Sequence, residues 1–190
     1  MARLLDQILV IDIEATCWKD RPPEGEEAEI IEIGLATLDT ATCERVKKES
    51  ILVRPERSRV SAFCTELTTL TQDDVEHGMS LADACARLKK RYRSRNLTWA
   101  SFGDYDRRQF ERQCARDGIQ YPFGATHLNV KNLLAFALGM RHEVGMAKAL
   151  ELAGLPLEGT HHRGVDDAWN IAALLGFLLR RLRSESSEPR

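Results

Sequence analysis

The chain has 190 residues, of which 43% are hydrophobic and 29% charged, and its formal net charge is -2. This composition is typical of a single globular domain and excludes disordered and fibrous proteins. The near-neutral charge gives no overall basic field for nucleic acid, although bound cations can hold a phosphate without Arg or Lys. No apolar run approaches the roughly 20 residues of a membrane span, so we expect no membrane partner.

The five cysteines are scattered along the chain and show no CxxC spacing. We therefore expect reduced thiols in a cytoplasmic protein, rather than a disulfide framework or a zinc site.

Residues 8–18 open with an apolar run, which is typical of a strand that is covered on both faces. Asp12 and Glu14, near the end of this run, are two residues apart, so both side chains leave the same face, about 7 Å apart. Two like charges at the end of a buried strand repel each other and resist desolvation. A divalent cation between them removes both difficulties, and the pair therefore predicts a metal site.

The next segments predict two more strands. A polar loop over residues 19–28 is followed by strand-like patterns at 29–38 and 45–53, which a short turn separates. The short connections indicate an antiparallel meander of three strands.

The rest of the chain is mainly helical in pattern. Ser80 is a candidate helix N-cap, with Asp83 three residues further on. We expect one more strand at 97–102 and helical segments at 61–77, 81–95, 104–116, 127–138 (which begins as a strand), 144–152 and 165–182. This order predicts an α/β domain, a mixed sheet of about five strands flanked by helices, over residues 1–183. Residues 184–190 are predicted to be a disordered tail.

The last helix carries an apolar stripe that ends at Leu178 and repeats every 3.6 residues. Extended back to the first turn, the stripe meets Asp167, whereas Asp166 lies on another face. An acid in this turn can simply interact with the helix dipole. A carboxylate on the buried face also requires a cation, which makes Asp167 a candidate metal ligand.

Two further groups of polar residues need partners. His161 and His162 lie in a loop bounded by glycines; they are ordinary surface residues if alone, and a candidate base if near a metal-activated water. Asp104 and Asp106 follow the strand at 97–102. Asp104 is placed to act as a helix N-cap, whereas Asp106 has no such structural role. Either acid can face the opening strand.

Taken in order, these motifs resemble the DEDDh group of 3′→5′ exonucleases in the ribonuclease-H-like superfamily. The likeness lies in residues 12–17, in the Gly-Asp-Tyr-Asp motif at 103–106 and in residues 162–167. Further matches at 29–32 and within 63–71 are similar to the Eri-1-like and 3′-histone-mRNA exoribonucleases and their bacterial, single-domain relatives. Each motif alone is weak, but the ordered set, covering about residues 8–179, is specific.

The resemblance implies five catalytic residues, namely Asp12, Glu14, Asp106, His162 and Asp167. Asp106 is preferred over Asp104 because the family acid follows an aromatic residue. His161 and Asp166 have the same spacing as His162 and Asp167, but Asp166 is off the buried helix face. The resemblance also implies two Mg²⁺ or Mn²⁺ ions about 4 Å apart, bridged by Asp12. Glu14 and Asp167 are then implied on one ion and Asp106 on the other, with His162 as the general base.

The implied reaction is removal of nucleoside 5′-monophosphates from the 3′ end of single-stranded RNA or of RNA 3′ overhangs. Ala15 and Thr16 are implied to approach the terminal sugar, and Phe63 and Leu67 its base, although plain core packing also explains the last two. RNA is favoured over DNA by the likeness to the exoribonuclease branch, since DNA exonucleases share the five catalytic positions. The arginines of the 104–116 helix are better candidates for phosphate contact than the basic run at 89–95.

Two other classes of protein share part of this pattern. A haloacid-dehalogenase-type phosphatase also starts with an apolar strand that ends in an acid pair, but its second acid is normally Asp, where this chain has Glu14. A non-catalytic nucleic-acid-binding module of the same fold is expected to have lost an acid or the histidine. Because all five positions are filled, the sequence favours an enzyme.

Overall fold

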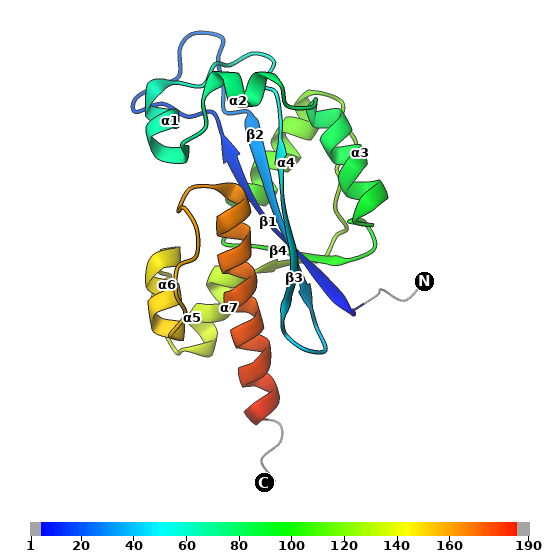
Figure 1. Ribbon diagram of the computed structural model, residues 1–190, viewed down its shortest axis with the longest axis vertical. Helices are drawn as coiled ribbons and strands as arrows, with labels where there is room; N and C mark the ends of the chain where they lie inside the picture. Colours follow the sequence, from blue (N-terminus) through cyan, green and yellow to red (C-terminus); the bar gives the residue numbers. More distant parts are fainter. Residues whose placement is uncertain (1–4, 186–190) are drawn as a thin grey trace.

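The computed structural model describes residues 5–185, which form one sheet with helices on both faces (Figure 1). The strands are β1 (Gln7–Ala15), β2 (Ile30–Asp39), β3 (Arg45–Leu52), β4 (Thr98–Ser101) and β5 (His127–Asn129). Their order across the sheet is β3-β2-β1-β4-β5, with β1 to β3 antiparallel and β4 and β5 parallel to β1. The predicted mixed sheet with an antiparallel first half is confirmed.

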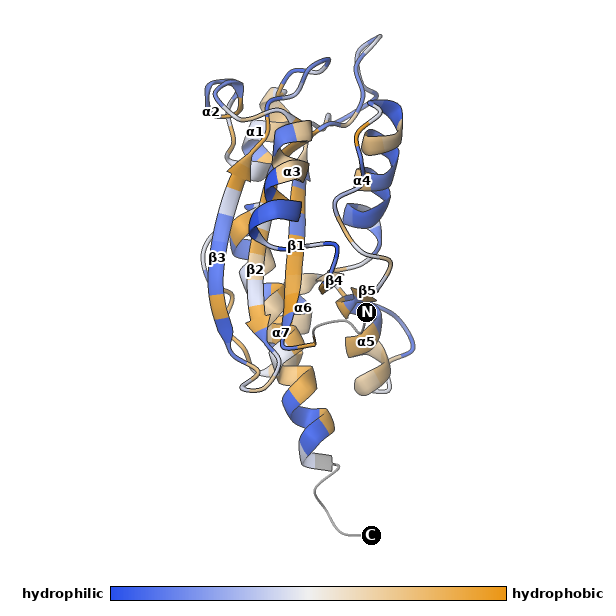
Figure 2. Ribbon diagram, turned by 90° about the vertical axis from the view of Figure 1, so that its right-hand side faces the viewer, coloured by the Kyte–Doolittle hydropathy of each residue, from blue (hydrophilic) through white to orange (hydrophobic). Residues whose placement is uncertain are grey.

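The helices are α1 (Ala62–Thr68), α2 (Gln72–Glu76), α3 (Leu81–Arg91), α4 (Tyr105–Arg116), α5 (Val130–Ala137), α6 (Met146–Ala153) and α7 (Gly164–Glu185). One hydrophobic cluster packs α3 and α4 on one face of the sheet, and a second packs α5, α6 and α7 on the other. The central strand β1 is mostly hydrophobic, whereas the edge strand β3 is largely hydrophilic (Figure 2). None of the helices in this described part of the chain combines the length and apolarity of a membrane span.

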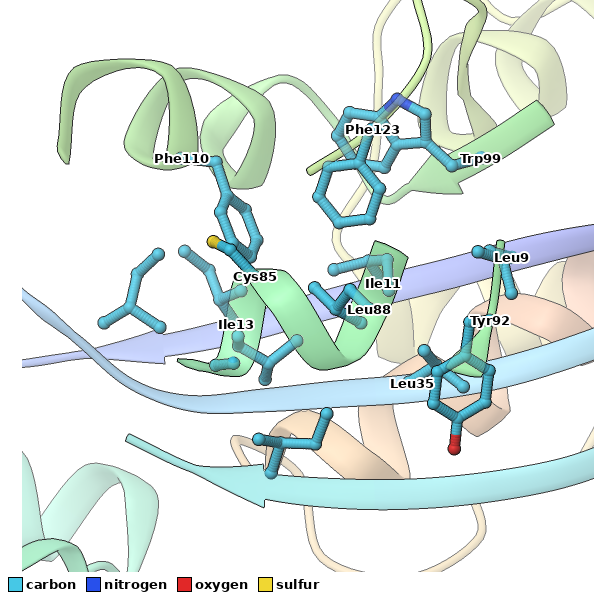
Figure 3. Close-up of a cluster of buried hydrophobic side chains, with 14 of the residues drawn as sticks. Leu9, Ile11, Ile13, Leu35, Cys85, Leu88, Tyr92, Trp99, Phe110 and Phe123 are labelled. Atoms are coloured by element: carbon cyan, nitrogen blue, oxygen red, sulfur yellow. The ribbon is translucent and has the colours of Figure 1, made fainter. Parts of the chain in front are cut away.

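The alternation of side chains along β1 fixes which face receives the two acids. Figure 3 shows Leu9, Ile11 and Ile13 on the side of β1 that packs against α3 and α4. Burying each of these side chains contributes roughly 1.5–3 kcal/mol to folding. Asp12 and Glu14 occupy the alternate positions and therefore point to the other face, where α7 lies. The predicted same-face arrangement is confirmed.

Strand β2 and the start of α7 approach so closely that Gly34 has no room for a side chain and Gly164 has very little. A Cβ on Gly34 would lie 1.8 Å from the carbonyl carbon of Gly164 and 2.3 Å from the nitrogen of Val165. A Cβ on Gly164 would lie 3.1 Å from the carbonyl oxygen of Asp12. This backbone contact sets the position of the first turn of α7, and hence of Asp167, against the end of β1.

Two sequence predictions about helix ends have different outcomes. Ser80 caps α3 as expected, since its hydroxyl accepts a hydrogen bond from the backbone N–H of Asp83 at 3.1 Å. Asp104 occupies the N-cap position of α4, but its side chain does not cap the helix. The Asp104 carboxylate is instead paired with Arg107 at 3.0 Å, so the prediction that Asp104 caps the helix was wrong.

Helix α7 continues to Glu185, and residues 186–190 of the predicted disordered tail lie outside the described residues.

Candidate active site

Four carboxylates that are far apart in the sequence meet in one pocket at the carboxyl end of β1. Asp12 and Glu14 come from β1, Asp106 from the first turn of α4, and Asp167 from the first turn of α7. Asp12, Glu14 and Asp167 each offer one carboxylate oxygen that lies within 4.8 Å of the other two. Together with both loop histidines, the four acids line a pocket of about 370 Å³, called the acid pocket below.

Asp106 is positioned by the backbone of β1. Strand β4 pairs with β1 only over Ile8 to Val10, so the N–H of Ile13, further along β1, has no strand partner on that side. Oδ1 of Asp106 accepts a hydrogen bond from this N–H at 2.9 Å, and the side chain is only 4% exposed. Asp104, in contrast, does not line the acid pocket. The geometry therefore favours Asp106 over Asp104.

Asp167 lies on the buried face of α7, as the helical period predicts, and is 3% exposed. Its carboxylate accepts a hydrogen bond from the backbone N–H of His162 at 2.9 Å and lies 3.1 Å from Nδ1 of His161. Asp166 points away and pairs with Lys48 at 2.7 Å. The alternative pair of His161 with Asp166 is not formed, although His161 itself contacts Asp167.

The two histidines stack on each other beside the acids, with ring centroids 4.0 Å apart. His162 has a φ of +64°, in the left-handed region that a residue with a side chain rarely adopts. The hydrogen bond from its backbone N–H to Asp167 helps to hold this conformation. Burial and the neighbouring His161 lower the pKa of His162, so its ring is neutral at pH 7. A neutral imidazole can accept a proton.

Burial and mutual repulsion disfavour the charged forms of the acids. Burial, followed by the charges of Asp167 and Glu32, raises the pKa of Glu14 to about 9. Burial and the neighbouring acids raise the pKa of Asp12 well above its usual range, and burial raises that of Asp106 to about 6. Burial also raises the pKa of Asp167, which His161 partly offsets. The four acids cannot all be charged at neutral pH without a positive counter-charge.

The donor set fits divalent cations. Carboxylate oxygens clustered within a few ångströms are the ligands that Mg²⁺ and Mn²⁺ prefer. A bound cation would favour the charged form of each acid and reverse the unfavourable electrostatics.

Glu32 is a buried acid that the sequence analysis did not assign to the site. It pairs with Glu14 in the register of β1 and β2 and is completely buried. Its carboxylate accepts hydrogen bonds from the backbone N–H of Gly164 at 3.0 Å, from Nε of Arg163 at 3.2 Å and from the Ser50 hydroxyl at 2.5 Å. Glu32 therefore ties the histidine loop and the start of α7 to the sheet. The sequence did contain a signal for Glu32, because this charged residue stands in a predicted strand whose other residues are mostly apolar.

The residues expected near a terminal sugar lie directly after the acids. Ala15 and Thr16 are both buried. The hydroxyl of Thr16 accepts a hydrogen bond from the N–H of Glu29 at 2.9 Å and donates one to the carbonyl oxygen of Glu27 at 3.2 Å. Because these bonds occupy the hydroxyl, Thr16 would form part of a wall rather than donate to a ligand.

The residues expected near a base lie on α1, which packs against the end of β1. Cys64 of α1 is buried, and its thiol contacts the carbonyl oxygen of Ala15 at 3.6 Å. Phe63 and Leu67, on the same helix, are each 36% exposed. Part of each side chain is therefore open to solvent, while the rest is covered by the protein.

Two further residues that line the acid pocket were not predicted as site residues from the sequence. Tyr105 is 57% exposed and lines the pocket beside Asp106. The sequence did contain a signal for it, because Tyr105 is the aromatic residue of the Gly-Asp-Tyr-Asp motif. Lys131, at the start of α5, also lines the pocket. No local sequence pattern marks Lys131, because only the parallel pairing of β4 with β5 brings it close to the acids.

Comparisons with known proteins identify related sequences and a related fold. Residues 9–175 match the model of the exonuclease family RNase_T. The 3′-5′ exonuclease Snipper of Drosophila melanogaster is 34% identical over 196 residues, which cover 91% of this chain and 69% of that protein. The human 3′-5′ exoribonuclease 1 is 31% identical over 179 residues, covering 89% of this chain and 51% of the relative, so this chain spans about half its length.

A comparison of folds points the same way. The structure of the nuclease domain of 3′hExo, a DEDDh family member bound to rAMP, superposes with a TM-score of 0.83 at 28% identity. The superposition covers 95% of this chain and 93% of that domain.

The raised pKa values predict how stability depends on pH in the absence of metal. The unfolded chain loses its carboxyl protons near pH 4, but Glu14 in the folded state retains its proton until about pH 9. Stability from these groups is therefore complete below pH 4 and is lost as the pH rises toward 9. We expect the protein in EDTA to lose at least about 2 kcal/mol over this range, or about 4–8 °C in Tm. Mg²⁺ should raise Tm more at pH 9 than at pH 5.

Thermal unfolding of two matched variants checks this origin. Glu14→Gln should flatten the pH dependence and reduce the Mg²⁺ shift, whereas Asp104→Asn, just outside the acid pocket, should change neither. A metal-free Tm that has the same pH dependence in wild type and in Glu14→Gln would contradict the electrostatic account.

Proposed function

The chain belongs to the exonuclease family as a 3′-5′ exonuclease of the DEDDh type, and from this premise we propose that it degrades single-stranded RNA or RNA 3′ overhangs. The products are nucleoside 5′-monophosphates. The observation that carries the proposal is the cluster of four carboxylates, three of them buried and that of Asp12 partly buried. Their charges require cations, and their position beside a neutral histidine suits phosphodiester hydrolysis.

Asp12, Glu14, Asp106 and Asp167 would hold two Mg²⁺ or Mn²⁺ ions. Asp12, which lies near Glu14, Asp167 and Asp106, would contribute to holding both ions. Glu14 and Asp167 would hold one ion with it, and Asp106 the other. The chemistry that such ions supply when bound is activation of a water molecule and neutralisation of charge on the phosphodiester.

His162 is the general base of this proposal. Its lowered pKa keeps an imidazole nitrogen free to take the proton from the attacking water. The water oxygen bonds to the terminal phosphorus, the bond from phosphorus to the 3′-oxygen of the preceding nucleotide breaks, and that oxygen takes a proton from solvent. Asp167 holds the backbone of His162, and Glu32 holds the adjoining residue Gly164, so the loop is fixed before the substrate arrives.

The terminal nucleotide would lie between β1 and α1. Ala15 and Thr16 form the wall beside its sugar, and Phe63 and Leu67 contact its base, as half-exposed apolar side chains are suited to do. A preference for RNA is supported by the relatives named exoribonuclease and by the rAMP bound to 3′hExo. All five cysteines are free thiols, which supports a reducing compartment, and we propose the cytoplasm.

The activity is tested with 5′-labelled RNA and DNA oligonucleotides of the same sequence in the presence of Mg²⁺ or Mn²⁺. We expect a ladder that shortens from the 3′ end, faster for RNA, and a loss of at least about 10³-fold in rate for Asp12→Ala. Asp104→Ala is the matched control and should remain active. Absence of cleavage of either polymer would refute the proposal. Faster cleavage of DNA than of RNA would show that DNA, and not RNA, is the preferred substrate.

The role of His162 is tested separately by comparing His162→Ala with His161→Ala. Loss of the base should lower kcat by about 10²- to 10⁴-fold, whereas loss of His161 should have a smaller effect through Asp167. Because the pKa of His162 is lowered, wild-type activity should persist at pH 6.5 and decline at lower pH, where the ring becomes protonated. If His161→Ala alone is inactive, His161 is the base and the assignment is wrong.

A further inference from the structure

A second pocket, with a basic wall, adjoins the acid pocket. It encloses about 440 Å³ between the start of α4 and the start of α5, and is called the basic pocket below. The two pockets share Phe102, Tyr105 and Lys131, so their surfaces are continuous. The basic pocket also carries Arg108 and Arg112 of α4. A ligand that extends from the acid pocket into the basic pocket therefore lies beside three cationic side chains.

The arginines of α4 divide into two kinds. Arg107 is bound to Asp104 at 3.0 Å, and Arg116 pairs with Glu29 at 3.1 Å, so both have structural partners. Arg108 is 75% exposed, and Asp104 approaches it only at 4.0 Å. The guanidinium of Arg112 donates to the amide oxygen of Gln109, which is neutral.

Lys131 completes the basic wall. Its Nζ lies 3.3 Å from Glu143, and both side chains are substantially exposed to solvent. Exposed ion pairs of this kind are weak and readily exchange one partner for a phosphate. Asp104 and Glu143 are the two acids of the basic pocket, and three cations outnumber them.

The sheet order gives the basic pocket a direction relative to the proposed substrate. Helix α1 packs on β2, on one side of the acids, whereas α4 and α5 follow β4 and β5, on the other side. If the terminal nucleotide lies against α1, as in the proposed function on which this inference rests, the rest of the strand extends toward α4 and α5.

We propose that Arg108, Arg112 and Lys131 bind the phosphodiester groups immediately 5′ to the scissile bond of a single-stranded nucleic acid. Contacts to the backbone carry no direct sequence information, so this site would bind strands of any sequence. Binding should therefore tighten with strand length until the basic pocket is filled, and it should depend on salt because phosphate contacts release counterions.

The test measures binding by fluorescence anisotropy, with labelled RNA strands of two to eight nucleotides. The Asp12→Ala variant is the common background, so that no strand is cleaved. We expect Arg108→Ala and Lys131→Ala to weaken binding of the hexanucleotide by roughly twofold to fivefold each. Each should reduce the slope of log affinity against log salt by about 0.7 for every lost contact. Arg108→Lys should retain most of the affinity, because the charge is kept.

The matched control is Arg95→Ala. This exposed arginine precedes β4, at the end of the sheet opposite to the acids, and should change neither affinity nor salt slope. Unchanged hexanucleotide binding in both Arg108→Ala and Lys131→Ala, or an equal effect of Arg95→Ala, would overturn the proposal. Because binding is measured without cleavage, this result is independent of the exonuclease assay. A protein that shortens RNA from its 3′ end while both variants bind normally would refute the basic pocket alone.

Discussion

Repulsion among four clustered carboxylates, three of them buried, is the constraint on which the rest of the structure depends. Hydrogen bonds hold two of them in place, from the Ile13 backbone to Asp106 and from the His162 backbone to Asp167. These contacts fix positions but do not supply a full positive charge, and the pKa of Glu14 still rises to about 9. The fold therefore brings together acids that become favourable together only when cations join them. A pocket with this property is suited to phosphodiester chemistry, where the same cations meet the phosphate.

The scaffold around the acids is rigid at the points where their geometry is decided. The backbone of Gly34 touches the backbone of Gly164, so α7 can begin at only one distance from the sheet. Glu32 binds the N–H of Gly164 and the side chain of Arg163, which fixes the loop that carries the histidines. The acid cluster thus depends on a fifth acid, Glu32, which is paired with Arg163. A site arranged in this way before its ligands bind has little reorganisation left to do.

Local periodicity was sufficient to predict part of this site. Alternation along β1 placed Asp12 and Glu14 on one face, and the helical period of α7 selected Asp167 over Asp166, because both patterns depend only on near neighbours. The contact of Glu32 with Arg163 joins a strand to a distant loop, and the position of Lys131 depends on the pairing of β4 with β5, so neither left a local pattern. Asp104 misled the prediction for a related reason, since its competing partner Arg107 is visible only once α4 is formed. The basic pocket is likewise lined by residues that follow β4 and β5, which are brought together by the pairing of these two strands.

The central claim is that the four carboxylates form a binding site for divalent cations. The most direct measurement is a crystal structure of the protein grown with Mn²⁺, with data collected for anomalous scattering. The account predicts anomalous density between the carboxylates of Asp12, Glu14 and Asp167, with Asp106 in reach of a second ion, and no such density in Asp12→Ala. An ordered acid pocket without anomalous density, in crystals that contain saturating Mn²⁺, would contradict it.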